Sequence, residues 1–560
     1  MNKPDLPRPS HEVLNQPPPL EETNLFELDV ALRETVTRNG AGAHTPELVA
    51  LGERLGTSEM IEHGRLANAH HPELRLFDRF GHRVNQVRYH PSYHALMKTS
   101  VEAGIHAQAW TDERPGALVA RLAKSFMMGQ VEQGHGCPIT MTFAVVPSLK
   151  LQPEVANVWL PRVTSWRYDP RDLPADQKEG CTTGMAMTEK QGGSDVRANS
   201  TVATPAGEGL GPGAWYRLVG HKWFCSAPMS DAFLTLAHTP KEGGRGGLTC
   251  FLVPRWAPDG QRNAIWIQRL KDKVGNRSNA SSEVEYHGAW AQMVGEEGRG
   301  VRTIIEMVQH TRLDCVVGSS AQIRHAVAQA AHHAQHRRAF GKALIEHPAM
   351  RNLLADLQLE SEAATAVWGR LGQAYARGVS DPKERAFARL ATAISKYHIC
   401  KRTPSVVYEA MEAHGGNGYV EEGPMGRLYR DAPLNSIWEG SGNVIALDVL
   451  RALMREPEAL EAFQEELVGA TGADRRYDAY VQKLAEELRD GRDMELRARR
   501  VVERMALAFE ASTLLRGAPA AVSDTFIATR LSGDRGVELG TLPSGVDFDA
   551  LLSRCLNRPR

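Results

Sequence analysis

The spacing of apolar residues changes three times along the chain. Between residues 24 and 180, apolar side chains recur every three or four positions in several segments, for example at Leu28, Leu32 and Val36, which predicts amphipathic helices. Between residues 181 and 296, short runs such as WYRLVGHKWF and LTCFLVP alternate with turn-forming residues, which predicts short strands. From Val301 the helical period returns and persists to the end of the chain.

These patterns predict an α+β protein that is mainly α. A chain of 560 residues exceeds what one hydrophobic core usually holds, so several domains are expected. We predict a leader and helical N-terminal domain at residues 1–180, a middle antiparallel β domain at 181–296, a four-helix bundle at 297–455 and a C-terminal helical domain at 456–560. The four bundle helices are expected at residues 301–334, 346–377, 382–413 and 441–455.

Composition limits the possible binding partners and the cellular compartment. A net charge of -1 gives no general attraction to nucleic acid or to an anionic membrane, so either partner would need a local patch. The seven cysteines are scattered, odd in number and without a CxxC pair, which predicts a reduced, cytoplasmic protein without a metal site. The proline-rich leader does not resemble a signal peptide, and no run of about 18 apolar residues predicts a membrane span.

The segment Arg427 to Leu447, RLYRDAPLNSIWEGSGNVIAL, carries a single glutamate, Glu439, among turn-forming residues. Pro433 prevents a helix from running through the preceding segment, and an apolar helical pattern follows the glutamate. Glu439 is therefore expected at a junction between a loop and a helix. A glutamate there could be a catalytic carboxylate, or it could only complement the helix dipole.

Two motifs in the β region could contact a cofactor. GMAMTEKQGGSD, residues 184–195, ends a predicted strand in a Gly-Gly turn whose N–H and hydroxyl groups suit a polar planar ring or a phosphate. HKWFCSAP places Trp223 and Phe224 before a small serine. An ordinary hairpin turn and a pair of core aromatic residues are the competing interpretations.

Two motifs in the bundle could contact a dinucleotide. RRAFG, residues 337–341, combines arginine with an aromatic ring, and HGGNGY, residues 414–419, is a glycine-rich break between helices. A helix C-terminal cap and a plain interhelical turn explain them equally well. The sequence has no GxGxxG after a strand and no GxxxxGK[ST], so neither a Rossmann nor a P-loop nucleotide site is indicated.

Taken together, these motifs resemble the acyl-CoA dehydrogenase flavoproteins. TEKQGGSD, HKWFCS, LKDKVGNRS, VGEEGRGV, RRAFG, GGNGY and RLYRDAPLNSIWEGSGN occur in the order and approximate spacing of that family, over roughly residues 50 to 455. The leader NQPPPLEETNLFELD and the extra C-terminal helices resemble the family members of the bacterial adaptive response to DNA alkylation. The resemblance implies the acyl-CoA dehydrogenase fold with an appended helical domain.

The resemblance also implies FAD as the cofactor and a homotetramer, built as a dimer of dimers, as the assembly. Arg337, Phe340, Gly415 and Gly416 would reach the FAD of a neighbouring subunit. The residues implied in the flavin site of the same subunit are Met185, Ala186, Met187, Thr188, Glu189, Ser194, Phe224, Cys225, Ser226, Ile437, Trp438, Gly440, Ser441, Gly442, Asn443 and Leu447.

By the same resemblance, Glu439 is the catalytic base, which removes the α-proton of an acyl thioester while the β-hydrogen leaves as hydride to the flavin. Two departures from the family pattern point to weak dehydrogenase activity. Many members carry Asp-x-x-Arg where this chain has Gln309, His310, Thr311 and Arg312, and many have Tyr in place of Trp438.

Finally, the resemblance implies that the C-terminal domain binds double-stranded DNA, without strong sequence preference, and that the protein limits alkylation damage. Residues 451–560 hold 17 Lys and Arg against 19 Asp and Glu, so composition does not predict this. The candidate DNA contacts are Arg475, Arg476, Lys483, Arg497, Arg499, Arg500 and Arg504.

The competing interpretation of these cations is a solvated helix face paired with Glu486, Glu487, Glu495 and Glu503. The small-molecule partner is expected to be an acyl thioester or an alkylating agent. The alternative functions are a working acyl-CoA dehydrogenase without a DNA role, and a flavin-stabilised scaffold without turnover.

Overall fold

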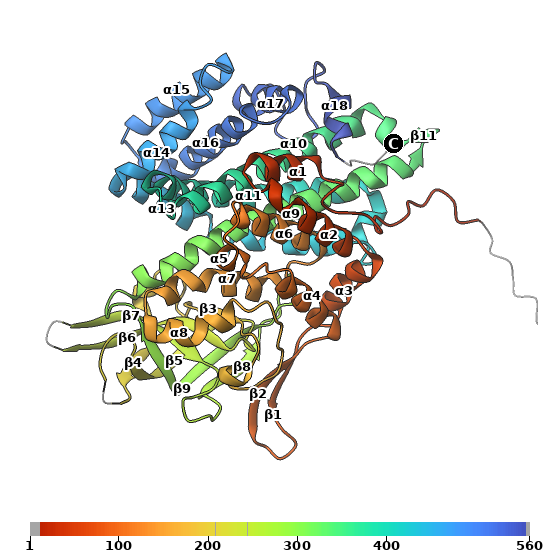
Figure 1. Cartoon of the computed structure of the whole chain (residues 1–560). Coiled ribbons are helices and arrows are strands. Elements are labelled where there is room, and N and C mark those ends of the chain that lie inside the picture. The colour runs from red at the N-terminus through yellow and green to blue at the C-terminus, as the bar shows by residue number, and fades with distance from the viewer. Residues whose placement is uncertain (1–11, 208, 243–244, 556–560) are drawn as a thin grey trace, which may run out of the picture.

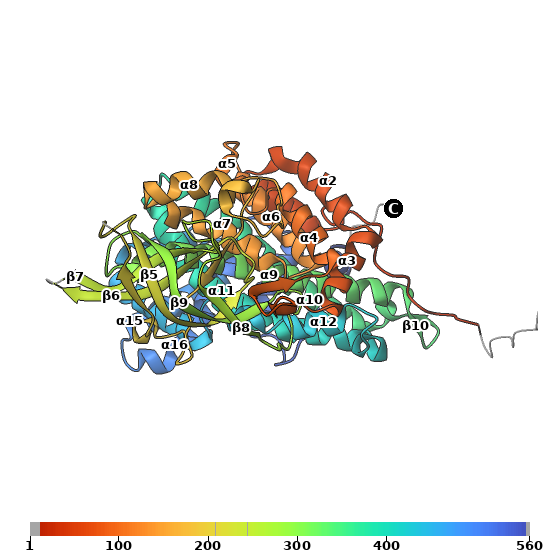
Figure 2. The same ribbon diagram turned by 90° about the horizontal axis from the view of Figure 1, so that it is seen from below.

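The computed structural model describes residues 12–207, 209–242 and 245–555. The first eleven residues of the predicted leader therefore lie outside the described part. A β sheet lies at one end of the molecule and the helices occupy the rest (Figure 1). Seen from below, the sheet and the small β10–β11 hairpin lie at opposite ends of the molecule (Figure 2).

The N-terminal part is helical, as predicted, but a β hairpin interrupts it. Strands β1 (Glu73–Phe77) and β2 (Arg83–Arg88) pair antiparallel and lie beside the β sheet (Figure 1). Val87 is buried in the same core as Phe251 of the sheet. The helices of this part are α1 (Val30–Arg38), α2 (Thr45–Leu55), α3 (Ser58–Ala69), α4 (Pro91–Glu102), α5 (Gln108–Thr111), α6 (Ala117–Val131), α7 (Gly136–Lys150) and α8 (Pro153–Val163).

The middle part forms one seven-stranded sheet in the order β3-β6-β4-β5-β9-β7, with β8 paired to β9. Most pairs are antiparallel, but β6 pairs in parallel with β3 and β4, and the additional pairing of β6 with β7 closes the sheet into a ring. The strands are β3 (Thr183–Ala186), β4 (Val202–Pro205), β5 (Trp215–Ser226), β6 (Ala232–Glu242), β7 (Arg245–Pro254), β8 (Ile265–Leu270) and β9 (Ser281–Val294).

Four long helices follow the sheet: α9 (Gly300–His336), α10 (Pro348–Arg377), α11 (Pro382–Ala413) and α13 (Gly442–Arg455). Their buried faces form one continuous core with the N-terminal helices. The shorter elements between them are β10 (Arg338–Ala339), β11 (Lys342–Ala343), the 3₁₀ turn Gly415–Tyr419, α12 (Met425–Asp431) and the 3₁₀ turn Leu434–Ser436.

The C-terminal helices pack on this bundle. Phe463 and Phe509 contact Phe387 of α11, and the buried Arg530 side chain pairs with Asp356 and Glu360 of α10. These helices are α14 (Pro457–Val468), α15 (Arg475–Arg489), α16 (Met494–Leu515), α17 (Ala520–Phe526) and α18 (Phe548–Ser553). The α+β, mainly α class is confirmed. Among the described helices, none combines the length and the apolar character needed to cross a lipid bilayer.

Candidate active site

The loop that carries Glu439 has a strained backbone. Glu439 has a φ of 57°, in the left-handed region, and the following Gly440 has a φ of 105°. A residue with a Cβ atom at such an angle costs about 1 to 3 kcal/mol and persists only where its surroundings hold it. Helix α13 starts directly after the loop, at Gly442, so Glu439 lies at the predicted junction between a loop and a helix.

Two buried cations hold this loop through three successive carbonyl groups. Lys396 of α11 donates from Nζ to the carbonyl oxygen of Trp438 at 2.8 Å and also to that of Gly440. Arg312 of α9 donates from Nε to the carbonyl oxygen of Glu439 at 3.0 Å. Only 1% of Lys396 is exposed. The loop conformation is therefore set by side chains from two helices.

Sequence reasoning did not identify Lys396. The available signal was a lysine within the apolar run of α11, between Ile394 and Ile399. Such a lysine usually extends its charge to solvent, so the pattern alone did not predict a buried partner.

Among the described residues, Thr311 is the direct side-chain partner of the Glu439 carboxyl group. Thr311 of α9 donates from Oγ1 to Glu439 Oε2 at 2.7 Å. Burial raises the pKa of Glu439, while the Thr311 hydrogen bond and the charges of Arg312 and Lys396 act in the opposite direction. A carboxyl group with a raised pKa binds a proton more readily than an ordinary glutamate, as a general base must.

Arg312 also forms an ion pair with Asp448 of α13, where Nη1 and Oδ2 are 2.8 Å apart. Arg312 is the arginine of the Asp-x-x-Arg pattern, whose aspartate this chain lacks. Its partner in this chain is an aspartate on another helix. The side-chain oxygen of Gln309, which stands in the position of the family aspartate, is buried without a hydrogen-bond partner among the described residues.

Thr311→Val tests the control of this carboxyl group. The Thr311 hydrogen bond stabilises the charged carboxylate by about 1.5 to 3 kcal/mol, so its loss should raise the pKa of Glu439 further. The base that the sequence predicts at Glu439 would act as the carboxylate, so the pH profile of the predicted flavin reduction should move to higher pH. Thr311→Ser, which keeps the hydroxyl group, should leave the profile in place. An unshifted profile in the valine variant would disprove the assigned contact.

Buried polar groups from other elements lie near Glu439. Burial raises the pKa of the Cys137 thiol to about 11, and the charges of Lys273 and Glu439 both act on it. Burial also lowers the pKa of Lys273 to about 8, and its ammonium donates to the carbonyl oxygen of Asn279 at 2.6 Å. Ser226, at the end of β5, lies 3.3 Å from Ser281 between their hydroxyl oxygens. Cys137, near the N-terminus of α7, is therefore close enough to Glu439 to be affected by its charge.

The predicted cofactor loop after β3 is shaped by an internal glutamate. Glu189 pairs with Lys222 at 2.9 Å and accepts the hydroxyl groups of Ser200 at 2.8 Å and Thr201 at 2.6 Å. Both of its carboxylate oxygens are thus used inside the protein. A Cβ atom on Gly193 would lie 2.4 Å from Thr188 Oγ1, so the Gly-Gly turn keeps this hydroxyl group close to the loop.

The other residues predicted to contact the flavin from the β sheet differ in exposure. Met185, Met187 and Thr188 are partly exposed, and half of the Phe224 side chain is exposed. Ala186 and Cys225 are buried in the core of the sheet, so only their backbone groups could face a cofactor. The residues predicted to contact the flavin from the Glu439 loop and the start of α13 are all partly or fully exposed: Ile437, Trp438, Gly440, Ser441, Gly442, Asn443 and Leu447.

Arg337 and Phe340 lie far from this loop within one chain. Arg312 is on α9 and Arg337 directly follows the C-terminal end of that helix, about 25 residues and so roughly 37 Å away. Phe340 is at the turn of the β10–β11 hairpin with 96% of its surface exposed, and Arg337 donates to the carbonyl oxygen of Asn15 at 2.7 Å. Gly415 and Gly416 form part of the 3₁₀ turn after α11.

The predicted DNA contacts fall into different environments on α15 and α16. Arg497, Arg500 and Arg504 all surround the Glu487 carboxylate. Arg476 pairs with Asp474 and Asp524. The side chains of Arg475 and Lys483 form no hydrogen bond or ion pair with any described residue. Arg499 instead faces the bundle, where it donates from Nε to Tyr397 Oη at 3.2 Å.

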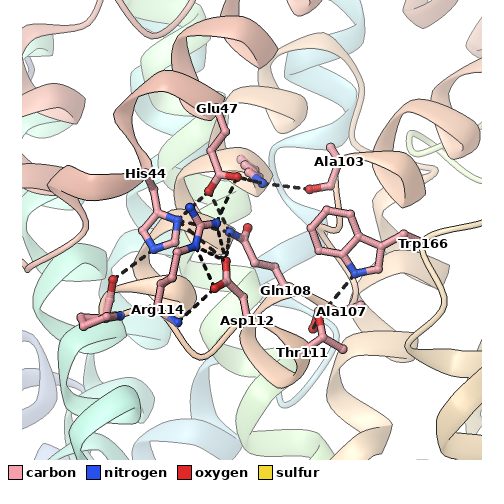
Figure 3. Close-up of polar contacts among 11 residues, drawn as sticks. His44, Glu47, Ala103, Ala107, Gln108, Thr111, Asp112, Arg114 and Trp166 are labelled. Carbon is pink, nitrogen blue, oxygen red and sulfur yellow. Dashed lines mark hydrogen bonds and ion pairs between the residues drawn. The ribbon is translucent and has the colours of Figure 1, made fainter.

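A polar cluster at α2 and α5 could be mistaken for a metal centre (Figure 3). His44, Glu47 and Asp112 bring their ligand atoms within 4.8 Å of one another. However, Arg114 pairs with Asp112 at 2.6 Å, and Lys124 lies 3.5 Å from Glu47. Fixed cations thus neutralise both carboxylates, which is a donor set unsuited to a metal ion.

Comparison with known proteins gives matches along most of the chain. Residues 15–170 match the family described as Adaptive response protein AidB N-terminal domain, residues 184–289 match the acyl-CoA dehydrogenase middle domain, and residues 298–454 match the acyl-CoA dehydrogenase C-terminal domain.

Relatives of similar length are also found. The chain is 49% identical to the putative acyl-CoA dehydrogenase AidB of Escherichia coli, over 86% of this chain and 87% of that protein. It is 30% identical to acyl-CoA dehydrogenase family member 11 of Caenorhabditis elegans, over 82% and 75% of the two chains. The solved structure of C. elegans ACDH-11 in complex with C11-CoA superposes with a TM-score of 0.83, at 26% identity, over 99% of this chain and 94% of that one.

Proposed function

Because this chain belongs to the acyl-CoA dehydrogenase family, in its AidB group, we propose that it is an FAD-dependent dehydrogenase-like protein with Glu439 as its base. The observation that carries the proposal is the Glu439 loop. A partly buried carboxyl group with a raised pKa is held in a left-handed backbone by Lys396, Arg312 and Thr311. Strain of this kind is concentrated at functional sites.

The residues around the loop fit a flavin. Asn279 is 1% exposed, and neither atom of its amide has a hydrogen-bond partner among the described residues, so it can pair with the polar ring of a bound group. The Ser226 hydroxyl and the half-exposed Phe224 ring are on the neighbouring strand. Ser441 and Asn443 open α13, where backbone N–H groups favour a phosphate.

In the proposed reaction, Glu439 takes the α-proton of an acyl thioester onto its carboxylate. The bound FAD would supply the hydride acceptor. The backbone N–H group of Glu439 donates to no described residue. This N–H group is free to polarise the carbonyl oxygen of the substrate as the proton leaves.

A homotetramer completes this proposal. The Phe340 ring is almost fully exposed at the turn of its hairpin and has an edge contact with the His347 ring, so in an assembly it can contact a neighbouring subunit, as can Arg337 and the Gly415–Gly416 backbone. The seven cysteines are free thiols, which supports a reducing, cytoplasmic location.

A second proposed role is sequence-tolerant binding of double-stranded DNA during the adaptive response to alkylation. The observation in its favour is that Arg497, Arg500 and Arg504 share the single carboxylate of Glu487, so this group keeps surplus positive charge. Arg475 and Lys483 add two cations without described partners. Such a surface can neutralise DNA phosphates without reading bases.

The pair Arg475→Gln and Arg500→Gln tests DNA binding. If both arginines contact phosphates, the slope of log affinity against log salt should fall by about one for each in a duplex retardation assay. Arg492→Gln, which removes an exposed arginine paired with Asp490, is the matched control. Wild-type protein that retards no duplex at low salt would exclude the DNA role. It would leave the alternative of a working acyl-CoA dehydrogenase.

A further inference from the structure

A cavity lies outside the Glu439 loop. It has a volume of about 420 Å³ and lies between strand β2 with the start of α4, the segment around Tyr168, and the loop that joins β5 to β6. Its lining residues include none from the Glu439 loop. Cavities of about 300 to 1,000 Å³ are typical of small-molecule sites.

Aromatic side chains form one side of this cavity. The Tyr89 and Tyr93 rings are stacked, with centroids 4.1 Å apart and planes 14° apart. The hydroxyl group of Tyr168 lies 2.7 Å from His94 Nδ1, which fixes both rings. Met97 and Met229 also line the space. Flat rings with thioether side chains favour a planar, mainly apolar ligand.

Two hydroxyl groups that line the cavity have no partner. Tyr89 Oη and Ser230 Oγ are both buried, and neither makes a hydrogen bond with a described residue. Ser230 is 2% exposed. Since buried polar groups are almost always paired, two unpaired hydroxyl groups on one cavity indicate a ligand that pairs with them.

The charged residues of the cavity indicate the sign of the charge that its ligand carries. Lys178 pairs with Asp231 at 2.6 Å, and Asp169 pairs with Arg171 at 2.6 Å, so both lining charges are neutralised. Arg88 also lines the cavity but forms no ion pair or hydrogen bond through its side chain with the described residues. The cavity therefore keeps one unbalanced positive charge beside its aromatic wall.

We propose that this cavity is a second binding site, separate from the Glu439 loop, for a planar aromatic anion of the aromatic carboxylate class. The rings of Tyr89 and Tyr93 contact the aromatic part of the ligand. Arg88 pairs with the carboxylate, and the Tyr89 and Ser230 hydroxyl groups bond to its polar atoms.

Calorimetric titration of the full-length, FAD-loaded protein with 2-naphthoate tests this site. We expect one bound probe per chain, with a dissociation constant that rises about fivefold to tenfold in Arg88→Gln and about threefold in Ser230→Ala. The neutral analogue 2-naphthalenemethanol should bind at least about tenfold more weakly. Arg79→Gln, at the exposed turn of the same hairpin, should bind like wild type.

A variant of the Glu439 loop tests whether the cavity is separate from that loop. Glu439→Gln should leave 2-naphthoate binding unchanged, because that residue does not line the cavity. The proposal is overturned if wild-type protein gives no binding heat at millimolar probe. It is equally overturned if Glu439→Gln weakens binding while Arg88→Gln and Ser230→Ala do not.

Discussion

Glu439→Gln is expected to reduce substrate-dependent flavin reduction by about 10² to 10⁴-fold, the usual contribution of a general base. Glutamine keeps the shape of the side chain and can still accept the Thr311 hydrogen bond, but it cannot take a proton. Anaerobic mixing of FAD-loaded protein with a panel of acyl-CoA thioesters, followed by the loss of flavin absorbance, measures the effect.

The controls for this variant separate chemistry from folding. Glu422→Gln changes an exposed glutamate near the start of α12 and should reduce the flavin at the wild-type rate. FAD content and thermal stability should be unchanged in Glu439→Gln. If that variant bleaches as fast as wild type, Glu439 is not the base. If neither protein is bleached by any thioester, the weak dehydrogenase activity expected for this chain is absent.

Lys396→Met is expected to have the largest structural effect. The ammonium group binds the carbonyl oxygens of Trp438 and Gly440, and methionine would leave both without that donor. An unsatisfied buried polar group costs about 1 to 3 kcal/mol, so a loss of about 2 to 5 kcal/mol of unfolding free energy follows. Urea unfolding should show a lower midpoint with an unchanged slope.

The same substitution should also release the strained loop. Without Lys396, the left-handed backbone at Glu439 loses one of its two restraining cations, so flavin reduction should slow together with the loss of stability. Lys401→Met is the matched control, because Lys401 is on the same helix and binds none of these carbonyl groups. Equal unfolding midpoints for Lys396→Met and wild type would contradict the assigned role.

Much of the fold could be predicted from the sequence because local periodicity decides it. The predicted helix at 382–413 has the bounds of α11, and the apolar runs at residues 215–224 and 248–254 lie within β5 and β7. The predicted acyl-CoA dehydrogenase fold is confirmed by the family matches and the superposed structures. The β1–β2 hairpin was missed because its strands are short and mostly half-exposed, and because its buried residue Val87 contacts a sheet far along the chain.

The sequence by itself determined the succession of helical, β and helical parts, the family, and the position of Glu439 in the loop just before a helix, since each depends on local periodicity or on short motifs. Only the tertiary structure decided that Lys396 and Arg312 bind the carbonyl groups around Glu439, that Asp448 pairs with Arg312, and that one carboxylate, Glu487, is shared by three arginines. The physical reason is that buried charges and carbonyl groups must be paired, and their partners come from helices distant in sequence, which no local pattern specifies.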